Sequence, residues 1–185
     1  MHRLVACRSS TRILAAVVSI STTFSHSSSF YGSEESERVR RQKLEVSERA
    51  VDEYIHSGSV VGVGTGSTVL FALTHLSELL SVGALENVRA VPCSEQTKTK
   101  CIALGIPVTN LNDTSHVDVI IDGADEVDLD LNMVKGGSGS FLREKMVQQA
   151  VPKRIIVVDE TKLVKNLVRT EGYEPPLTSP PLLQS

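Results

Sequence analysis

Short runs of β-branched, apolar residues alternate with helix-like segments along most of this chain, and each run ends in glycine or acidic residues. The runs at residues 117–121 and 154–158 are apolar almost throughout, a pattern typical of strands buried on both faces of a parallel sheet. Parallel strands need crossover connections, which are usually helices. The sequence therefore predicts an α/β fold: an open three-layer, doubly wound (Rossmann-like) domain with a mainly parallel sheet. Ligands in such folds bind beyond the carboxyl ends of the strands.

Hydrophobic periodicity locates the helices. Between residues 37 and 56, apolar side chains recur mostly at steps of three and four, which predicts an amphipathic helix. Gly58 follows as a helix-ending residue. The other predicted helices cover residues 67–80, 94–104, 141–150 and 161–167, and the other predicted strands cover residues 60–63, 88–91 and 106–111.

The two ends of the chain differ from this middle part. Residues 1–33 contain no Asp or Glu and are rich in serine, with arginines at positions 3, 8 and 12. That composition is typical of an organellar transit peptide, and a secretory signal or a disordered leader without function are the alternatives. We expect a plastid or mitochondrial location if the leader is a transit peptide, and a cytoplasmic one otherwise. The α/β domain then covers residues 34–167, followed by an irregular, proline-rich tail at 168–185.

Composition excludes several classes of protein. The net charge is −3, aromatic residues make up 4% of the chain and there is no Trp, which argues against a nucleic-acid-binding surface. The apolar run at residues 13–20 is shorter than a membrane span requires. The three cysteines do not make a disulfide framework and lack the spacing of a zinc site. We expect no nucleic-acid partner, no membrane partner and no metal.

The first motif follows the predicted strand at 60–63 and opens the next helix. It consists of Gly64, Thr65, Gly66, Ser67 and Thr68. Small residues allow close approach of a ligand, and the free N–H groups of a helix start favour an anion such as phosphate. The motif lacks the Gly-Lys-Ser/Thr ending of a P-loop. The alternative is a plain tight turn in which Ser67 or Thr68 caps the helix.

Acidic and basic residues follow two further predicted strands. Asp122, Gly123 and Asp125 end the strand at 117–121, and paired carboxylates serve proton transfer, sugar hydroxyls or a metal. The alternative is an acidic turn. Lys162 follows the strand at 154–158, where it is placed either to reach a phosphate or to remain in solvent.

A third motif joins a lysine to a glycine loop and a helix. Lys135, Gly136 and Gly137 precede the helix that carries Glu144. The loop is suited to fold around a small ligand, with Lys135 against a developing oxyanion and Glu144 as a general base. The alternative for Glu144 is a solvated helix residue paired with a neighbouring lysine.

Together these motifs resemble ribose-5-phosphate isomerase of the A type. The matching pieces are VGVGTGST, IDGADEVD, the KGG loop that runs into LREK, and VVDETK, within about residues 42–164, and the sequence looks like plant and algal members. The resemblance implies interconversion of D-ribose 5-phosphate and D-ribulose 5-phosphate through a cis-enediolate, in the non-oxidative branch of the pentose phosphate pathway. It implies a small-molecule sugar phosphate as partner, with no cofactor and no metal.

The resemblance also assigns roles to the residues. Glu144 is the base that moves the proton, and its pKa is expected to rise when the substrate excludes water. Lys135 and the N–H groups of Gly136 and Gly137 stabilise the enediolate oxygen. Asp122, Gly123 and Asp125 hold sugar hydroxyls and assist ring opening. The 5-phosphate is held by Gly64, Thr65, Gly66, Ser67, Thr68 and Lys162.

Three departures from the family pattern are visible. Ser138 stands in the glycine loop where members usually have glycine, which costs about 1 kcal/mol if that position needs a positive φ. Lys43 lies near the place of a phosphate-binding lysine but is displaced by about one residue, so it is left out of the predicted site. Family chains continue past VVDETK into a small α+β lid domain, which this sequence does not show.

The missing lid has consequences for the expected behaviour. In the family the lid closes the site and takes part in a homodimer or homotetramer. We therefore expect a truncated chain that is poorly soluble and weakly active or inactive, because sheet edges and apolar faces stay uncovered. The alternative function is a non-catalytic fragment of the same fold that binds sugar phosphate or assembles with a full-length isomerase.

Overall fold

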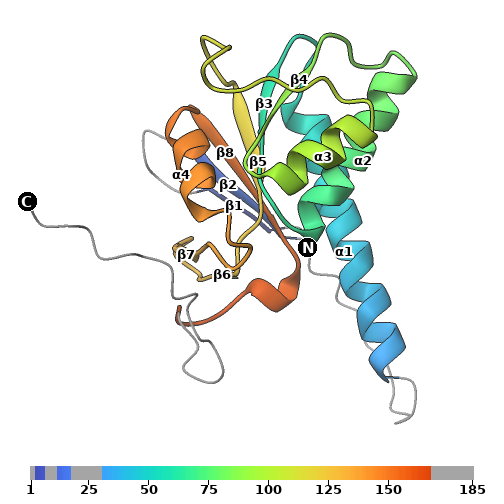
Figure 1. Cartoon of the computed structure of the whole chain (residues 1–185). Coiled ribbons are helices and arrows are strands. Elements are labelled where there is room, and N and C mark those ends of the chain that lie inside the picture. Colours follow the sequence, from blue (N-terminus) through green and yellow to red (C-terminus); the bar gives the residue numbers. More distant parts are fainter. Residues whose placement is uncertain (1–2, 7–11, 18–30, 168–185) are drawn as a thin grey trace, which may run out of the picture.

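The computed structural model describes residues 3–6, 12–17 and 31–167 of the 185-residue chain. A six-stranded sheet lies at its centre in the order β1-β2-β8-β5-β3-β4. Neighbouring strands run parallel, apart from the antiparallel pair β1 and β2. This confirms the predicted α/β fold with a mainly parallel sheet (Figure 1). The strands are β1 (Arg3–Ala6), β2 (Arg12–Val17), β3 (Val60–Val63), β4 (Arg89–Pro92), β5 (Val119–Asp122) and β8 (Lys153–Val158).

Helices cover both faces of the sheet. One face packs against α1 (Tyr31–Tyr54), α2 (Ser67–Ser81) and α3 (Glu95–Ala103) in the main apolar core. The other face packs against α4 (Phe141–Gln149) and against the short hairpin of β6 (Glu126–Val127) and β7 (Met133–Val134). Figure 1 shows α4 and the hairpin on the opposite side of the sheet from α1 and α2.

The alternation of side chains along each strand builds the two cores. Val119 and Ile121 of β5 point into the core under α1 and α2, whereas Ile120 between them packs under α4, as expected for a period of two. Gly62 of β3 brings α4 close, because a Cβ there would lie 2.8 Å from Cγ1 of Val147. Because β8, β5 and β3 are neighbours in the sheet and run parallel, their carboxyl ends lie side by side.

Most predicted elements are confirmed, with bounds shifted by a few residues. The prediction of a strand at residues 106–111 is wrong: Val108 forms a single bridge with Ala90, in a stretch without regular structure. The helix predicted at 161–167 is a single 3-10 turn, η1 (Glu160–Lys162), and the helix predicted to begin at residue 37 starts at Tyr31.

The first residues of the chain contribute to the sheet, whereas the last ones are not described. The backbone of β1 and β2 pairs beside β8, so two strands form within residues 1–33, which the sequence analysis left outside the fold. The proline-rich tail at 168–185 lies outside the described residues. Within the described part of the chain, no helix is both long and apolar enough to cross a membrane.

Candidate active site

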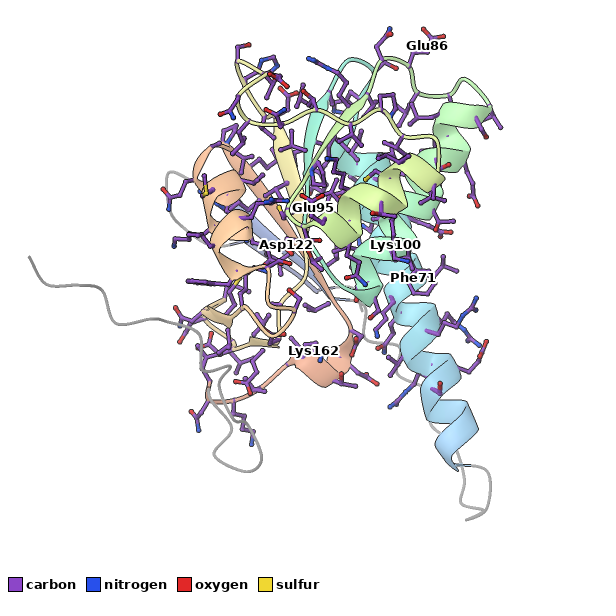
Figure 2. All side chains as sticks on the ribbon, viewed as in Figure 1. Phe71, Glu86, Glu95, Lys100, Asp122 and Lys162 are labelled. Atoms are coloured by element: carbon purple, nitrogen blue, oxygen red, sulfur yellow. The ribbon has the colours of Figure 1, made fainter. Side chains whose placement is uncertain are left out.

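A cavity of about 160 Å³ opens at the carboxyl ends of the parallel strands. Its walls come from the turn after β3, the turn after β5, the glycine loop before α4, and η1. Figure 2 shows Asp122 near the centre of the molecule and Lys162 on the turn that follows β8. The topology thus brings the sequence motifs together at one edge of the sheet, as doubly wound folds require.

Residues 64–68, the anion loop, form one end of this cavity. Gly66 precedes α2 with a φ of 145°, and no side chain of the described residues caps this end of the helix. The predicted alternative, a cap by Ser67 or Thr68, is therefore absent. Gly66, Ser67 and Thr68 line the cavity at this uncapped start of α2, an arrangement suited to an anion.

Gly64 connects the anion loop to the strand that carries Asp122. A Cβ at Gly64 would lie 1.9 Å from Oδ1 of Asp122 and 2.9 Å from its Cα. No side chain fits there without moving β5. Two motifs that lie almost 60 residues apart in the sequence are thus in direct contact.

A chain of hydroxyl groups that no sequence motif indicates lies behind the anion loop. Oγ1 of Thr65 donates to Oγ of Ser94 (2.9 Å), Ser94 donates to Oγ1 of Thr97 (2.9 Å), and Thr97 donates to the carbonyl of Gly64 (2.9 Å). Ser94 also caps α3 by accepting from the N–H of Thr97. The cap was readable from the sequence, but its contact with Thr65 depends on the fold.

Lys43, which the sequence analysis set aside, reaches the anion loop. Its Nζ donates to Oγ of Ser67 (3.1 Å) and lies 3.6 Å from Oδ2 of Asp159. Ser47, one helical turn later on α1, donates to the carbonyl of Thr68. The i, i+4 spacing of Lys43 and Ser47 was the signal that one face of this helix meets the loop.

Three charged side chains, Asp122, Lys135 and Glu144, form the acid end of the site. Nζ of Lys135 lies 2.9 Å from Oδ2 of Asp122 and 3.4 Å from Oε2 of Glu144, and it donates to the carbonyl of Gly123. Glu144 is only 2% exposed, so the alternative of a solvated helix residue is wrong. Burial, and then the charge of Asp122, raises the pKa of Glu144, while Lys135 opposes this rise.

The two aspartates of the second motif occupy different places. Asp122 is 0% exposed and lies behind the cavity, where Oδ1 accepts from the N–H of Gly123 and Oδ2 from Gln148 and Lys135. Asp125 lines the cavity and accepts from the N–H of Gly137 at 2.9 Å. A Cβ on Gly137 would lie 2.6 Å from Oδ1 of Asp125, so this close contact requires glycine.

Comparison with known proteins shows the family of this chain. Residues 89–174 match the family model of ribose 5-phosphate isomerase A (phosphoriboisomerase A). The chain belongs to the ribose-5-phosphate isomerase A family. The chain is similar to ribose-5-phosphate isomerase A of Desulfatibacillum aliphaticivorans, with 47% identity over 125 residues, 68% of this chain and 54% of that protein.

Two further relatives carry the same family name. A probable ribose-5-phosphate isomerase 3, chloroplastic, of Arabidopsis thaliana is 48% identical over 120 residues, which are 65% of this chain and 43% of that protein. A solved structure of D-ribose-5-phosphate isomerase in complex with phospho-erythronic acid matches with a TM-score of 0.68 and 36% identity, over 70% of this chain and 56% of that one. The chain spans about half the length of the curated relatives that it matches.

The glycine loop shows how this chain accommodates its departure from the ribose-5-phosphate isomerase pattern. Gly136 and Gly139 have φ values of 115° and 79°. Ser138 does not have a positive φ; in the described part of the chain, the residues other than glycine that do are Asn87 and Leu131. The strain considered for Ser138 is therefore absent. The hydroxyl of Ser138 donates to Oε1 of Glu144 at 3.2 Å.

Proposed function

We propose that this chain carries the catalytic part of a ribose-5-phosphate isomerase, which interconverts D-ribose 5-phosphate and D-ribulose 5-phosphate. The observation that carries the proposal is the pairing of buried Glu144 with Lys135 at one end of a cavity whose other end is the anion loop. The family names of the relatives, and the phospho-erythronic acid bound to one of them, support the same substrate class.

The anion loop is proposed to hold the 5-phosphate. The N–H groups at the start of α2 and the hydroxyls of Ser67 and Thr68 supply donors, with Gly64, Thr65 and Gly66 shaping the backbone. Lys162 lines the same cavity, and Lys43 already donates to Ser67. These lysines balance the charge of the phosphate, and fixing it positions a flexible sugar for reaction.

Glu144 is proposed to remove the proton beside the carbonyl and return it to the neighbouring carbon. Its raised pKa brings a carboxylate closer to the basicity that proton abstraction needs. Lys135, with the N–H groups of Gly136 and Gly137, stabilises the enediolate oxygen. Asp125, Gly123 and the glycine loop contact the sugar hydroxyls and assist ring opening, whereas Asp122 acts from beneath by holding Lys135.

Turnover of ribose 5-phosphate tests the proposal. The full chain is assayed with EDTA present, beside Glu144→Gln and beside Glu86→Gln, a matched change at an exposed glutamate far from the cavity. We expect weak turnover, because the chain spans about half the length of its relatives, and we expect this turnover to be metal-independent, abolished by Glu144→Gln and unchanged by Glu86→Gln. Activity that persists in Glu144→Gln, or that EDTA removes, would reject this mechanism.

One alternative deserves its own measurement, because the chain spans about half of its relatives. A non-catalytic fragment of the same fold would bind sugar phosphate or assemble with a longer isomerase without turnover. Calorimetric titration with phospho-erythronic acid, and light scattering alone and with a longer relative, separate these cases. Binding without turnover favours the fragment, and turnover by the isolated chain excludes it.

We also propose two finer properties of the family for this chain. The serine- and arginine-rich first residues are proposed to direct it to a plastid, a proposal that a chloroplastic relative supports. A fusion of residues 1–33 to a fluorescent protein tests this, and a diffuse signal would oppose it. A homodimer or homotetramer is the proposed assembly, and light scattering measures it.

A further inference from the structure

Gln148 is a side chain that the sequence motifs and the proposed mechanism leave unused. It lies on α4 one helical turn after Glu144, and its Nε2 donates to Oδ2 of Asp122 at 2.8 Å. The helix is tied down at this level, because Nε of Arg154 on β8 donates to the backbone carbonyl of Gln148 at 2.8 Å. The amide is therefore held over the Asp122 carboxylate.

The buried carboxylate of Asp122 needs hydrogen-bond donors around it. Its side chain is 0% exposed, and a buried carboxylate is costly unless donors satisfy its oxygens. Oδ1 accepts from the N–H of Gly123 at 2.8 Å, and Oδ2 accepts from both Gln148 and Lys135. An ionised carboxylate only accepts hydrogen bonds, so Gln148 must present its NH₂ group here.

Lys135 is shared between two acids. Its Nζ lies 2.9 Å from Asp122 and 3.4 Å from Glu144. Without a second donor on Oδ2 of Asp122, the ammonium would be drawn toward that buried oxygen and away from Glu144. The amide of Gln148 supplies this donor without adding charge.

We propose that Gln148 is a positioning residue of the active site, which satisfies the buried Asp122 and thereby keeps the Lys135 ammonium shared between Asp122 and Glu144. The inference rests on the proposed isomerase function for its catalytic meaning. Its test measures the ionisation of Glu144 and does not need turnover.

Other ionisable groups face this cluster from the neighbouring elements. Cys93, at the end of β4, has a pKa raised far above the usual range by burial and by the charges of Asp122 and Glu144, so the thiol stays neutral at moderate pH. Arg143 on α4 is turned to Glu95 of α3, at 2.8 Å, and Asp125 faces the cavity from the turn after β5. The thiol of Cys93 therefore adds no charge change to a titration of Glu144.

The experiment is a carbon-13 NMR titration of the Glu144 carboxyl in the full chain, with its signal assigned by its absence in Glu144→Gln. Gln148→Leu removes the amide at similar size, and Gln148→Glu replaces it with an isosteric acid. We expect the midpoint of Glu144 to rise by about half a pH unit to one unit in Gln148→Leu, and by more in Gln148→Glu. Gln149→Leu and Gln149→Glu, at the exposed neighbouring position, should leave it unchanged.

An unchanged Glu144 midpoint in folded Gln148 variants would overturn the inference and make Gln148 an anchor of α4 only. If Gln148→Leu does not fold, Gln148→Glu, which keeps the size and shape of the side chain, carries the same test. Loss of folding in both variants, with the Gln149 controls folded, also counts against a positioning role. Shifted midpoints in a chain without turnover would support the inference while rejecting the proposed isomerase activity.

Discussion

The two ends of the cavity are built in different ways. The anion loop is one continuous stretch of backbone at the start of α2, and neutral hydroxyls such as Thr97 hold it from behind. The acid end joins single charged side chains from β5, the glycine loop and α4. Several backbone N–H groups share the binding of an anion, so the loss of one supporting side chain changes their positions little. A buried charge, in contrast, is stabilised mainly by one partner, and removing that partner leaves the charge buried and unpaired. Charge changes at the acid end should therefore cost more than hydroxyl deletions at the anion loop.

The largest expected effect comes from Lys135→Met. This change leaves the buried carboxyl groups of Asp122 and Glu144 without the ammonium between them. We expect the free energy of unfolding at neutral pH to fall by about 3–5 kcal/mol, as for other broken buried ion pairs. Denaturant unfolding measures it, with Lys145→Met at an exposed position of α4 as control. A loss no greater than that of the control would mean that the acid end is solvated.

Gly64→Ala tests the one point where the two ends touch. The new Cβ would lie 1.9 Å from Oδ1 of Asp122, so β3 and β5 must separate. We expect a loss of about 3 kcal/mol, at the upper end of overpacking costs. Gly123→Ala is the matched control, since its nearest atom would be at 3.8 Å. Equal thermal unfolding midpoints for the two variants would show that the ends are not in rigid contact.

Thr97→Val examines the anion loop alone. The variant keeps the shape of a buried side chain but loses the hydrogen bond to the carbonyl of Gly64 and the acceptor for Ser94. We expect a loss of about 1–2 kcal/mol in stability and weaker binding of inorganic phosphate in calorimetry. Thr99→Val, exposed on the same helix, should change neither. A stability loss as large as that of Lys135→Met would remove the contrast between the two ends.

Glu144→Gln separates stability from function at the acid end. Burial raises the pKa of Glu144 in the folded chain, so the folded state binds this proton more tightly than the unfolded state does. Stability from this group is present below the unfolded pKa of about 4.3 and is lost as pH rises through the folded pKa. We expect Glu144→Gln to raise the Tm by about 2–4 °C at about pH 8 and to leave it unchanged near pH 4. A uniform shift at both pH values would contradict this assignment.

The same contrast explains what sequence could and could not predict. The anion loop is local: a strand, glycines and a helix start are adjacent in the sequence, so the sequence alone predicts a binding loop at residues 64–68. The strands at 117–121 and 154–158 were equally visible from their apolar runs. The strand predicted at 106–111 is wrong, because Val108 makes only a single bridge and the strand propensity of a segment does not show whether it pairs with a neighbour.

The sequence predicts the individual residues of the acid end but not the contacts between them. Lys135 and Glu144 stood out through motif and resemblance, while their shared contact with Asp122 depends on how α4 packs across Gly62. Gln148 carried no signal, because a glutamine on a helix is usually solvated. Lys43 is absent from the predicted site because it is displaced by about one residue from the phosphate-binding lysine of the family. Its side chain is long enough to reach Ser67 in spite of that displacement.

Ser138→Gly is the smallest and the most specific test of the acid end. The family pattern favours glycine in this loop, but Ser138 has no positive φ here and its hydroxyl donates to Glu144 at 3.2 Å. Glycine would add freedom to the unfolded chain and remove that donor, so we expect a loss of about 0.5 kcal/mol and a slight rise in the pKa of Glu144. Denaturant unfolding and the same NMR titration measure both. A gain in stability would instead mean that position 138 needs a left-handed backbone, and that the loop closes differently around Glu144.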